Sequence, residues 1–469
     1  MIRKKAIYAP IKTIIRQANK EVIMDLDNFD ESQREAITSP EDNVVIRAPA
    51  GSGKTTCAIE AIVNYRYNYI NDKICAITYT RAAKAEMEQR LKQHGVYDVD
   101  VATIHAWSRS YIYEFATKHG ETVRLLDEFD IAEILQNLCD EYLKYSNVHF
   151  INQYALRRYI NEHKVDEKDE RNKKTYEAIE SRYVQYKREK GLYDFTDLPQ
   201  YLYDLMVKYD EYITDINALF VDEFQDVDPI QIEVFKRVIN TRKKFYIGDK
   251  WQSIYQFRSA DGKAFDKLDG FTQYKLKYNY RSYQEIINYA TTVYESTAPV
   301  INELVESEHH RDTPYIAKVL FSYPSSITCE RGYGGKITVI NPFNMVYRVC
   351  NEEESKTRCG EKMAYNIFKQ YLADHPNVMI LCRTNKQVNE IRKKTNLTAD
   401  TIHQAKGLEY GDVLVIDSPI TTSEDLNIAY VALTRAKNSL LVAPWEKMLA
   451  YITERNNNEI LKQAFGGIE

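Results

Sequence analysis

The 469-residue sequence has few of the residues that make irregular or disulfide-stapled proteins. It has 16 glycines and 12 prolines, about half of average usage, which disfavours fibrous, loop-rich and disordered architectures. Its seven cysteines form no CxxC pair, so we expect reduced thiols and a cytoplasmic location, in a bacterium or a virus-infected cell. The sequence has no run of about 20 apolar residues, so we expect no membrane span.

An excess of positive charge is also missing, because 63 Lys and Arg face 68 Asp and Glu, for a formal net charge of −5. This balance excludes binding to nucleic acid through attraction over the whole surface, but it is compatible with a local basic groove. Tyrosine, by contrast, is abundant with 37 residues. We expect most of these rings to pack in cores, since that is the usual place of an aromatic side chain.

The order of the patterns predicts an α/β protein of two domains with a parallel sheet in each. Residues 1–26 form a basic arm, and strands and helices then alternate through 27–107 and 193–278, the first domain. Charged, Tyr-rich helical patterns fill 108–192, which we interpret as a helical insertion. Residues 279–469 form the second domain, with an irregular insertion near 297–334 that contains several Pro and Gly breakers.

A phosphate-binding loop is predicted at residues 48–55, where APAGSGKT follows the apolar run VVI and precedes a helical pattern. Successive backbone N–H groups of such a loop cradle phosphate oxygens. Lys54 would reach the β- and γ-phosphates and Thr55 would hold Mg²⁺. The nucleotide-binding residues expected here are Ala50, Gly51, Ser52, Gly53, Lys54, Thr55 and Thr56.

Two carboxylates follow the apolar run ALFV at residues 218–221. Because an α/β sheet binds ligands at the carboxyl ends of its strands, Asp222 and Glu223 should face the phosphate-binding loop. Asp222 would help Thr55 to hold the metal, and Glu223 would orient or deprotonate the attacking water. The two motifs together predict hydrolysis of a nucleoside triphosphate, and they leave the coupled work unspecified.

Further segments carry a family resemblance. They are FDESQ (29–33), TIHAW (103–107), VDEFQDVD (221–228), GDKWQSIYQFR (248–258), NYRS (279–282), TIHQAKGLE (401–409) and AYVALTR (429–435). In this order they resemble the motifs of UvrD/Rep-type superfamily 1 DNA helicases, over about residues 27–443. The resemblance implies two RecA-like domains that clamp ATP between them and move along single-stranded DNA, normally from 3′ to 5′.

The resemblance also assigns roles at the nucleotide. Gln33 would read the adenine edge, Tyr280 would stack on the base and Glu409 would meet the ribose. Gln252 would sense the γ-phosphate, which Arg281 and Arg435 of the second domain would stabilise. Cations are needed where charge spreads over γ-phosphoryl oxygens, and their supply from a second domain makes hydrolysis depend on closure of the cleft.

A groove for single-stranded DNA, and contact with duplex junctions, are implied as well. The matching positions are Tyr79, Thr80, Arg81, Thr103, His105, Tyr255, Phe257 and His403. Bases stacked on aromatic rings such as Tyr255 and Phe257 gain about 1–3 kcal/mol each regardless of their identity, which suits a motor. Trp107 of the TIHAW motif is interpreted as a packing residue.

The sequence departs from the family in one large feature. Relatives carry an accessory domain between the segments that resemble VMILCRTN (378–385) and TIHQAKGLE, where this sequence has only residues 386–400. We therefore expect a compact form without the accessory insertion of the second domain. Ala48 and Ser259 replace usual glycines, changes that we expect to be tolerated.

Two hypotheses of function follow. The first is a monomeric ATP-dependent DNA helicase or translocase that works with replication, repair or defence proteins. The alternative is a DNA-stimulated ATPase that acts as a switch in a larger repair, recombination or defence complex and does not unwind DNA itself. Strand displacement by the isolated chain distinguishes them. A small-molecule kinase is excluded because it would need neither the QSIYQFR segment nor two γ-phosphate arginines.

Overall fold

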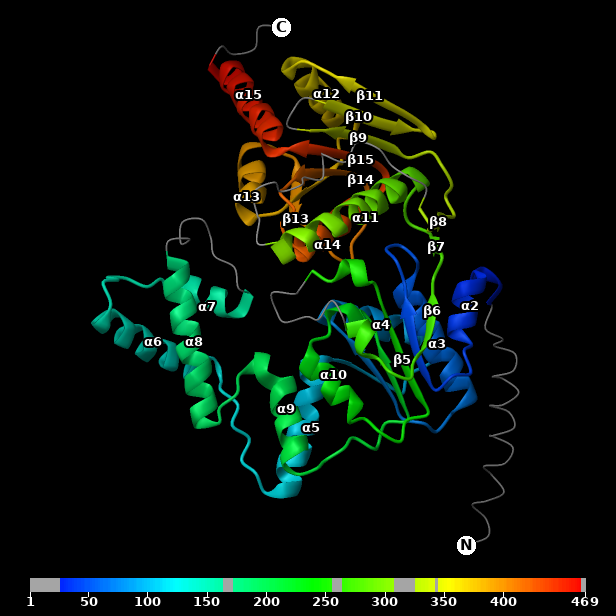
Figure 1. Cartoon of the computed structure of the whole chain (residues 1–469), viewed down its shortest axis with the longest axis vertical. Coiled ribbons are helices and arrows are strands. Elements are labelled where there is room, and N and C mark those ends of the chain that lie inside the picture. The colour runs from blue at the N-terminus through cyan, green and yellow to red at the C-terminus, as the bar shows by residue number, and fades with distance from the viewer. Residues whose placement is uncertain (1–25, 163–171, 255–263, 308–324, 342–344, 465–469) are drawn as a thin grey trace.

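The structure is a computed structural model that describes residues 26–162, 172–254, 264–307, 325–341 and 345–464. Two α/β lobes lie one above the other in Figure 1, and a small group of helices stands beside the lower lobe. We call the lower one the first lobe and the upper one, which begins near residue 278, the second lobe. The predicted α/β class with two lobes is confirmed.

The first lobe is built on a sheet of parallel strands in the order β3-β2-β4-β5-β1-β6. The strands are β1 (Asn43–Arg47), β2 (Ile74–Thr78), β3 (Val99–Thr103), β4 (Ala218–Val221), β5 (Lys243–Gly248) and β6 (Thr272–Lys275). The inner strands β1, β2, β4 and β5 have apolar, buried central runs, as expected for parallel strands covered on both faces, whereas the edge strand β6 is mostly exposed.

Helices cover both faces of this sheet. One face carries α2 (Glu31–Ile37), α3 (Lys54–Asn68) and α4 (Arg81–Gln93), and the other α5 (Ile104–His119), α9 (Leu198–Lys208) and α10 (Pro229–Lys236). Short 3₁₀ turns are η1 (Leu26–Asn28), η3 (Phe195–Asp197), η4 (Phe224–Asp226), η5 (Lys250–Gln252) and η7 (Ala264–Lys267). Alternate strand residues enter the two cores, as the period of a strand requires.

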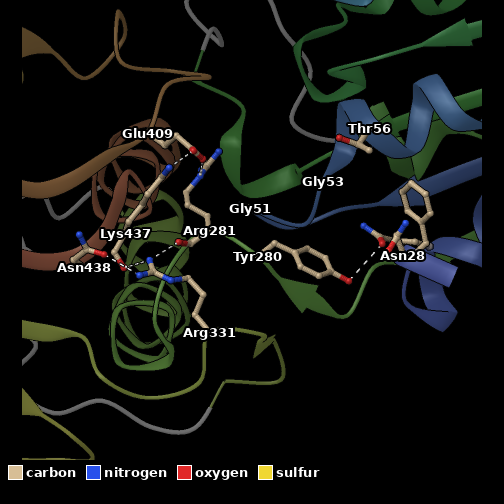
Figure 2. A pocket seen from close by; sticks show the side chains of 12 residues that line it. Asn28, Gly51, Gly53, Thr56, Tyr280, Arg281, Arg331, Glu409, Lys437 and Asn438 are labelled. Atoms are coloured by element: carbon tan, nitrogen blue, oxygen red, sulfur yellow. Dashed lines mark hydrogen bonds and ion pairs between the residues drawn. The ribbon is translucent and has the colours of Figure 1, made fainter. Parts of the chain in front are cut away.

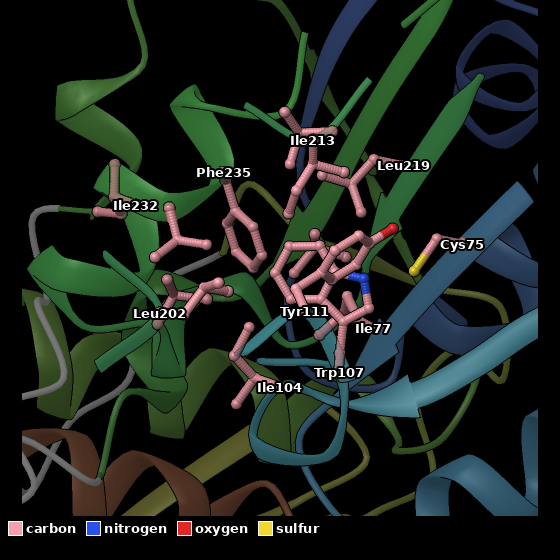
Figure 3. Close-up of a cluster of buried hydrophobic side chains, with 14 of the residues drawn as sticks. Cys75, Ile77, Ile104, Trp107, Tyr111, Leu202, Ile213, Leu219, Ile232 and Phe235 are labelled. Carbon is pink, nitrogen blue, oxygen red and sulfur yellow. The ribbon is translucent and has the colours of Figure 1, made fainter. Parts of the chain in front are cut away.

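The helical insertion starts later than predicted. Helix α5 directs Trp107, Tyr111 and Phe115 into the core against the first sheet, so it belongs to the first lobe (Figure 3). The separate helices are α6 (Glu128–Tyr145), α7 (Gln153–Glu162) and α8 (Lys173–Lys190), which share a small core of their own. The predicted boundaries 108–192 are therefore corrected to about 126–192, next to a bridge between Leu125 and Tyr193.

The second lobe has a sheet in the order β11-β10-β9-β15-β14-β12-β13. The strands are β9 (Lys336–Ile340), β10 (Met345–Cys350), β11 (Glu353–Arg358), β12 (Met379–Cys382), β13 (Thr398–Thr401), β14 (Tyr410–Asp417) and β15 (Ala436–Pro444). Strands β9 and β12 to β15 are parallel, as predicted, whereas β10 runs antiparallel to both β9 and β11. This antiparallel edge was not predicted.

Helices also cover both faces of the second sheet. Helices α11 (Gln284–Ser307) and α14 (Ser423–Leu433) share one core, while α12 (Glu361–Asp374), α13 (Asn385–Lys394) and α15 (Trp445–Ala464) lie at the other. Strands β7 (Tyr278–Asn279) and β8 (Thr328–Cys329) pair where the chain passes between the lobes. The irregular segment predicted near 297–334 is corrected at its start, because α11 continues through Pro299 to Ser307. Residues 308–324 of that prediction lie outside the described residues, and 325–334 consist mainly of turns around β8.

Between β12 and β13 the structure holds helix α13 and short turns, with no room for a further domain. In the described part of the chain, no helix combines the length and the apolar character that a membrane span requires.

Candidate functional site: a nucleotide cleft between the lobes

The phosphate-binding loop connects β1 to α3, as predicted. Gly51 and Gly53 have positive φ angles of 71° and 78°, which glycine adopts without steric cost. A Cβ on Gly51 would lie 2.5 Å from Nδ2 of Asn279, and a Cβ on Gly53 would lie 3.0 Å from Nε2 of Gln33. Lys54 is the first residue of α3, so the N-terminus of that helix opens into the loop.

Gln33 and Tyr280 lie together at one end of the loop. Gln33 is buried and donates from Nε2 to the carbonyl of Ser52 at 3.0 Å. The Tyr280 hydroxyl donates to Oδ2 of Asp30 at 2.6 Å, and its ring stays 39% exposed, so one face remains accessible to a base. Asp30 also caps helix α2, which holds Gln33 in its third position.

The predicted metal and water residues are brought to the other side of the loop. The Thr55 hydroxyl donates to Oδ2 of Asp222 at 3.0 Å, next to Lys54. Burial, followed by the charge of Glu223, raises the pKa of Asp222 to about 7. Burial works in the same direction on Glu223, but the charges of Lys54 and Lys406 and the hydrogen bond from Gln225 together lower the pKa of that carboxyl. A cation at Thr55 and Asp222 would compensate the buried charge.

Arg281 and Glu409 meet across from the loop, in a cavity of about 560 Å³. Arg281 donates from Nε to Oε2 of Glu409 at 2.9 Å, and Lys437 forms a second ion pair with the same carboxylate (Figure 2). Burial opposes the charged form of Glu409, but Lys437 and Arg281 lower the pKa of that carboxyl. The cavity is lined by Asn28, Phe29, Gln33, Gly51, Gly53, Thr56, Tyr280, Arg281, Arg331, Glu409, Lys437 and Asn438.

Arg435, the second expected arginine, is buried with 1% exposure at the end of α14. It donates to the carbonyls of Val431 and Leu408, each at 2.9 Å. Burial and the neighbouring Arg281 lower the pKa of Arg435 to about 9. The structure therefore gathers two guanidinium groups of the second lobe on the side of the cleft that faces the first lobe.

Gln252 is connected to Glu223 through a chain of hydrogen bonds. Gln225 donates from Nε2 to Oε2 of Glu223 at 2.5 Å and accepts from the backbone N–H of Asp249 at 2.8 Å. Asp249 accepts from Nε2 of Gln252 at 2.7 Å. Gln225 had no predicted role, although it stands in the motif VDEFQDVD; its link to Asp249 arises only through the fold.

Polar contacts from the second lobe also reach the first lobe deeper in the cleft. Asn279 donates from Nδ2 to the carbonyl of Ala50 at 2.6 Å. Lys406 lies 2.5 Å from Oδ2 of Asp226, and both side chains are buried. These residues stand inside recognised motifs, but only the three-dimensional arrangement reveals the contacts.

The predicted DNA residues of the first lobe gather at the carboxyl ends of β2 and β3. Tyr79 and His105 line a cavity of about 390 Å³ between the first lobe and the helical insertion. Phe195 lines it too, and its ring stacks on His105 with a centroid distance of 4.9 Å and an angle of 16°. Phe195 is 58% exposed and was not predicted, because DF before a helix carries no local signal for DNA.

The other predicted DNA residues are more scattered. Thr80 and Arg81 are exposed at the start of α4, where the Thr80 side chain accepts from the N–H of Ala83 as an N-cap. Thr103 is the N-cap position of α5, and His403 lies half-buried in the loop after β13. The predicted stacking residues Tyr255 and Phe257 lie outside the described residues.

The donor set fits a magnesium–nucleotide complex. Gly51 and Gly53 form a cradle that a Cβ would fill, and the helix N-terminus behind it suits an anion. Thr55 and Asp222 offer the hard oxygen ligands that Mg²⁺ prefers. Opposite them, the cations of the second lobe face the cavity.

Comparison with known proteins agrees with this geometry. The sequence matches the family described as "UvrD/REP helicase N-terminal domain" over residues 29–273 and the one described as "UvrD-like helicase C-terminal domain" over residues 396–443. It is 27% identical over 392 residues to a protein named "ATP-dependent DNA helicase Rep" from Buchnera aphidicola subsp. Schizaphis graminum, covering 78% of this chain and 54% of that protein.

Two further relatives differ in coverage. A "Probable DNA helicase" of Mycoplasma pneumoniae is 24% identical over 478 residues, 89% of this chain and 83% of that protein. "DNA helicase II" of Escherichia coli is 27% identical over 304 residues, 58% of this chain and 41% of that protein. The chain spans about half the length of several curated relatives that it matches. The first family match covers more than half of the chain, and so the chain belongs to the UvrD/Rep helicase family.

Proposed function

We propose that this chain is an ATP-dependent motor that moves from 3′ to 5′ along single-stranded DNA and unwinds duplex at a junction. The observation that carries the proposal is the divided nucleotide cleft, in which Gly51 and Gly53 of the P-loop and Arg281 of the second lobe line one cavity. The buried Arg435 of the second lobe lies close enough for its charge to help lower the pKa of Glu223. The names of the relatives, all of which contain the word helicase, support the same activity.

Within the cleft, each residue has a separate task. Lys54 binds the terminal phosphates, while Thr55 and Asp222 hold Mg²⁺, which supplies Lewis-acid stabilisation of phosphate charge. Burial raises the pKa of Glu223, but Lys54, Lys406 and Gln225 together lower it and favour the carboxylate, so it can orient water and accept a proton. The two arginines stabilise charge on the γ-phosphoryl oxygens, an effect worth about 10³–10⁵ in rate in related systems.

Because these groups come from both lobes, hydrolysis requires a closed cleft and product release favours an open one. The chain of hydrogen bonds from Glu223 through Gln225 and Asp249 to Gln252 reports the state of the nucleotide site. On the DNA side, His105 and Phe195 offer a stacked aromatic surface for bases of any identity. Opening and closing of the cleft would therefore change the spacing of DNA contacts on the two lobes.

Strand displacement tests activity and direction together. We expect unwinding of a duplex with a 3′ single-stranded tail and none of a duplex with a 5′ tail. Lys54→Ala should abolish both unwinding and DNA-stimulated ATPase, while Lys393→Ala, an exposed lysine of α13, should leave both unchanged. ATP hydrolysis without displacement of either substrate would contradict the helicase and favour a switch ATPase.

A further inference from the structure

Arg331 lines the nucleotide cavity, yet no family motif quoted above includes it. It lies in the loop between β8 and β9, and its guanidinium donates to backbone groups of the protein. Nη1 donates to the carbonyl of Arg281 at 3.0 Å and to the carbonyl of Lys437 at 2.9 Å (Figure 2). Nη2 donates to Oδ1 of Asn438 at 2.9 Å. Both hydrogens of Nη1 are thereby used within the protein.

The two carbonyls belong to the segments that carry the γ-phosphate arginines. One is the carbonyl of Arg281 itself, and the other lies two residues after Arg435, at the start of β15. The same two segments are joined by a hydrogen bond from the Ser282 hydroxyl to the carbonyl of Ala436 at 2.6 Å. Through its hydrogen bonds to these two carbonyls, Arg331 therefore links the backbone segments that position both arginines.

The loop is built to hold Arg331 in this place. Its guanidinium lies over the ring of Tyr283 at 3.9 Å from the centroid, which fixes the plane of the donor group. The buried carboxylate of Glu285 accepts from the N–H groups of Gly334 and Gly335, each at 3.0 Å. A Cβ on Gly335 would lie 2.8 Å from Cβ of Tyr283, so this close approach requires glycine.

We propose that Arg331 is a positioning residue that fixes Arg281 and Arg435 relative to each other through their backbone segments. This inference rests on the proposed function, because it needs both arginines to act on the γ-phosphate. A lysine replaces the planar fork only in part, since its ammonium could reach the carbonyls but would lose the flat stack on Tyr283 and the separate Nη2 donor to Asn438. The expected defect is in the rate of hydrolysis, with nucleotide binding little changed.

The test is the steady-state ATPase of the full chain with saturating single-stranded DNA. Arg331→Met should lower kcat by about 10- to 100-fold, because a displacement near 1 Å of a catalytic group can cost 10²-fold. KM for ATP should stay within about twofold, as expected when an interaction is lost only in the transition state. Arg348→Met, an exposed arginine of β10, is the matched control and should behave as the unsubstituted chain.

Conservative variants separate an effect of Arg331 on kcat from an effect on the folding of the second lobe. Arg331→Lys should recover part of kcat, and Asn438→Ala should have little effect because it removes only the contact to Nη2. Thermal unfolding of each variant shows whether the second lobe is intact. If Arg331→Met does not fold, Arg331→Lys and Tyr283→Leu carry the test, and an unchanged kcat in both overturns the proposal.

Combination with Arg281→Ala gives the decisive comparison. The loss caused by Arg331→Met should be smaller in that background, because one of the two positioned arginines is already absent. Equal losses in both backgrounds, or a raised KM with unchanged kcat, would show that Arg331 acts on the nucleotide directly and would overturn positioning. If Arg281→Ala itself leaves DNA-stimulated ATPase intact, the proposed function fails, whatever Arg331→Met does.

Discussion

Lys406→Met would leave the carboxylate of Asp226 at the closed cleft without the ion pair that now compensates it. Both side chains are buried, with exposures of 8% for Lys406 and 1% for Asp226. Oδ1 of Asp226 finds no hydrogen-bond partner among the described residues, so the carboxylate depends strongly on Lys406. Because the two residues come from different lobes, the loss should act on closure of the cleft more than on the folding of either lobe.

The magnitude follows from the cost of a buried charge. Breaking one side of a buried ion pair costs about 3–5 kcal/mol, which corresponds to a loss of roughly 10²–10⁴-fold in DNA-stimulated ATPase. Burial, only partly opposed by Lys406, already raises the pKa of Asp226 to about 6. A folded-state pKa above the unfolded value means that protonation stabilises the buried form as the pH falls, so the deficit should shrink by up to about tenfold between pH 7.5 and pH 6.

The double variant Lys406→Met with Asp226→Asn removes both charges. Replacement of a buried pair by neutral groups is often nearly neutral, so its ATPase should stay within about tenfold of the unsubstituted chain. Lys393→Met, on the exposed face of α13, is the matched control. The assay is ATP turnover with saturating single-stranded DNA from pH 6 to pH 8, with thermal unfolding of each variant. Two results would refute the reasoning: unchanged ATPase in Lys406→Met, or a double variant whose ATPase is as low as that of Lys406→Met.

The remaining predictions concern the loop, the DNA surface and the core. Gly51→Ala should abolish binding of a fluorescent ATP analogue, because its Cβ would lie 2.5 Å from Asn279 Nδ2; retained binding would contradict the contact. Phe195→Leu should weaken binding of an oligo-dT strand by about 1–3 kcal/mol in fluorescence anisotropy, with DNA-free ATPase unchanged, because the stack on His105 is lost. Trp107→Phe should lower the unfolding temperature by a few degrees while DNA affinity persists; a selective loss of affinity would make Trp107 a DNA contact.

The parts of the site that could be predicted are those whose chemistry depends on neighbours in the chain. The loop around Lys54 needs glycines at fixed offsets, and Asp222 directly follows a buried strand, so both carry a local signal. Arg331 carries none, because its function arises from carbonyls 50 and 106 residues away. Phe195 similarly gains its place only when the chain returns from the helical insertion to meet His105.

The fold shows the same difference between features that a local sequence pattern reveals and features that depend on distant contacts. Apolar runs predicted the inner parallel strands of both sheets, since these are buried on two faces, but not the parallel edge strands β3, β6 and β13, which are less buried. The hairpin of β10 and β11 was missed because every residue of Glu353–Arg358 is exposed, so this edge strand lacks an apolar face. Helix α5 was assigned to the insertion because its period matches that of the helices after it. Its inward residues Trp107 and Tyr111 reveal their partners only in three dimensions.

The segment around Gln252 is one of the first-lobe segments that the second lobe contacts. Trp251 stacks on Tyr294 at 4.6 Å, and Asn427 donates to the carbonyl of Ser253 at 2.7 Å, so the second lobe contacts the residues on either side of Gln252. A hydrogen bond of this kind contributes about 0.5–1.5 kcal/mol, a size that differential binding of nucleotide can outweigh. Movement of the second lobe would therefore act directly on the segment that carries Gln252, the residue that we propose senses the γ-phosphate.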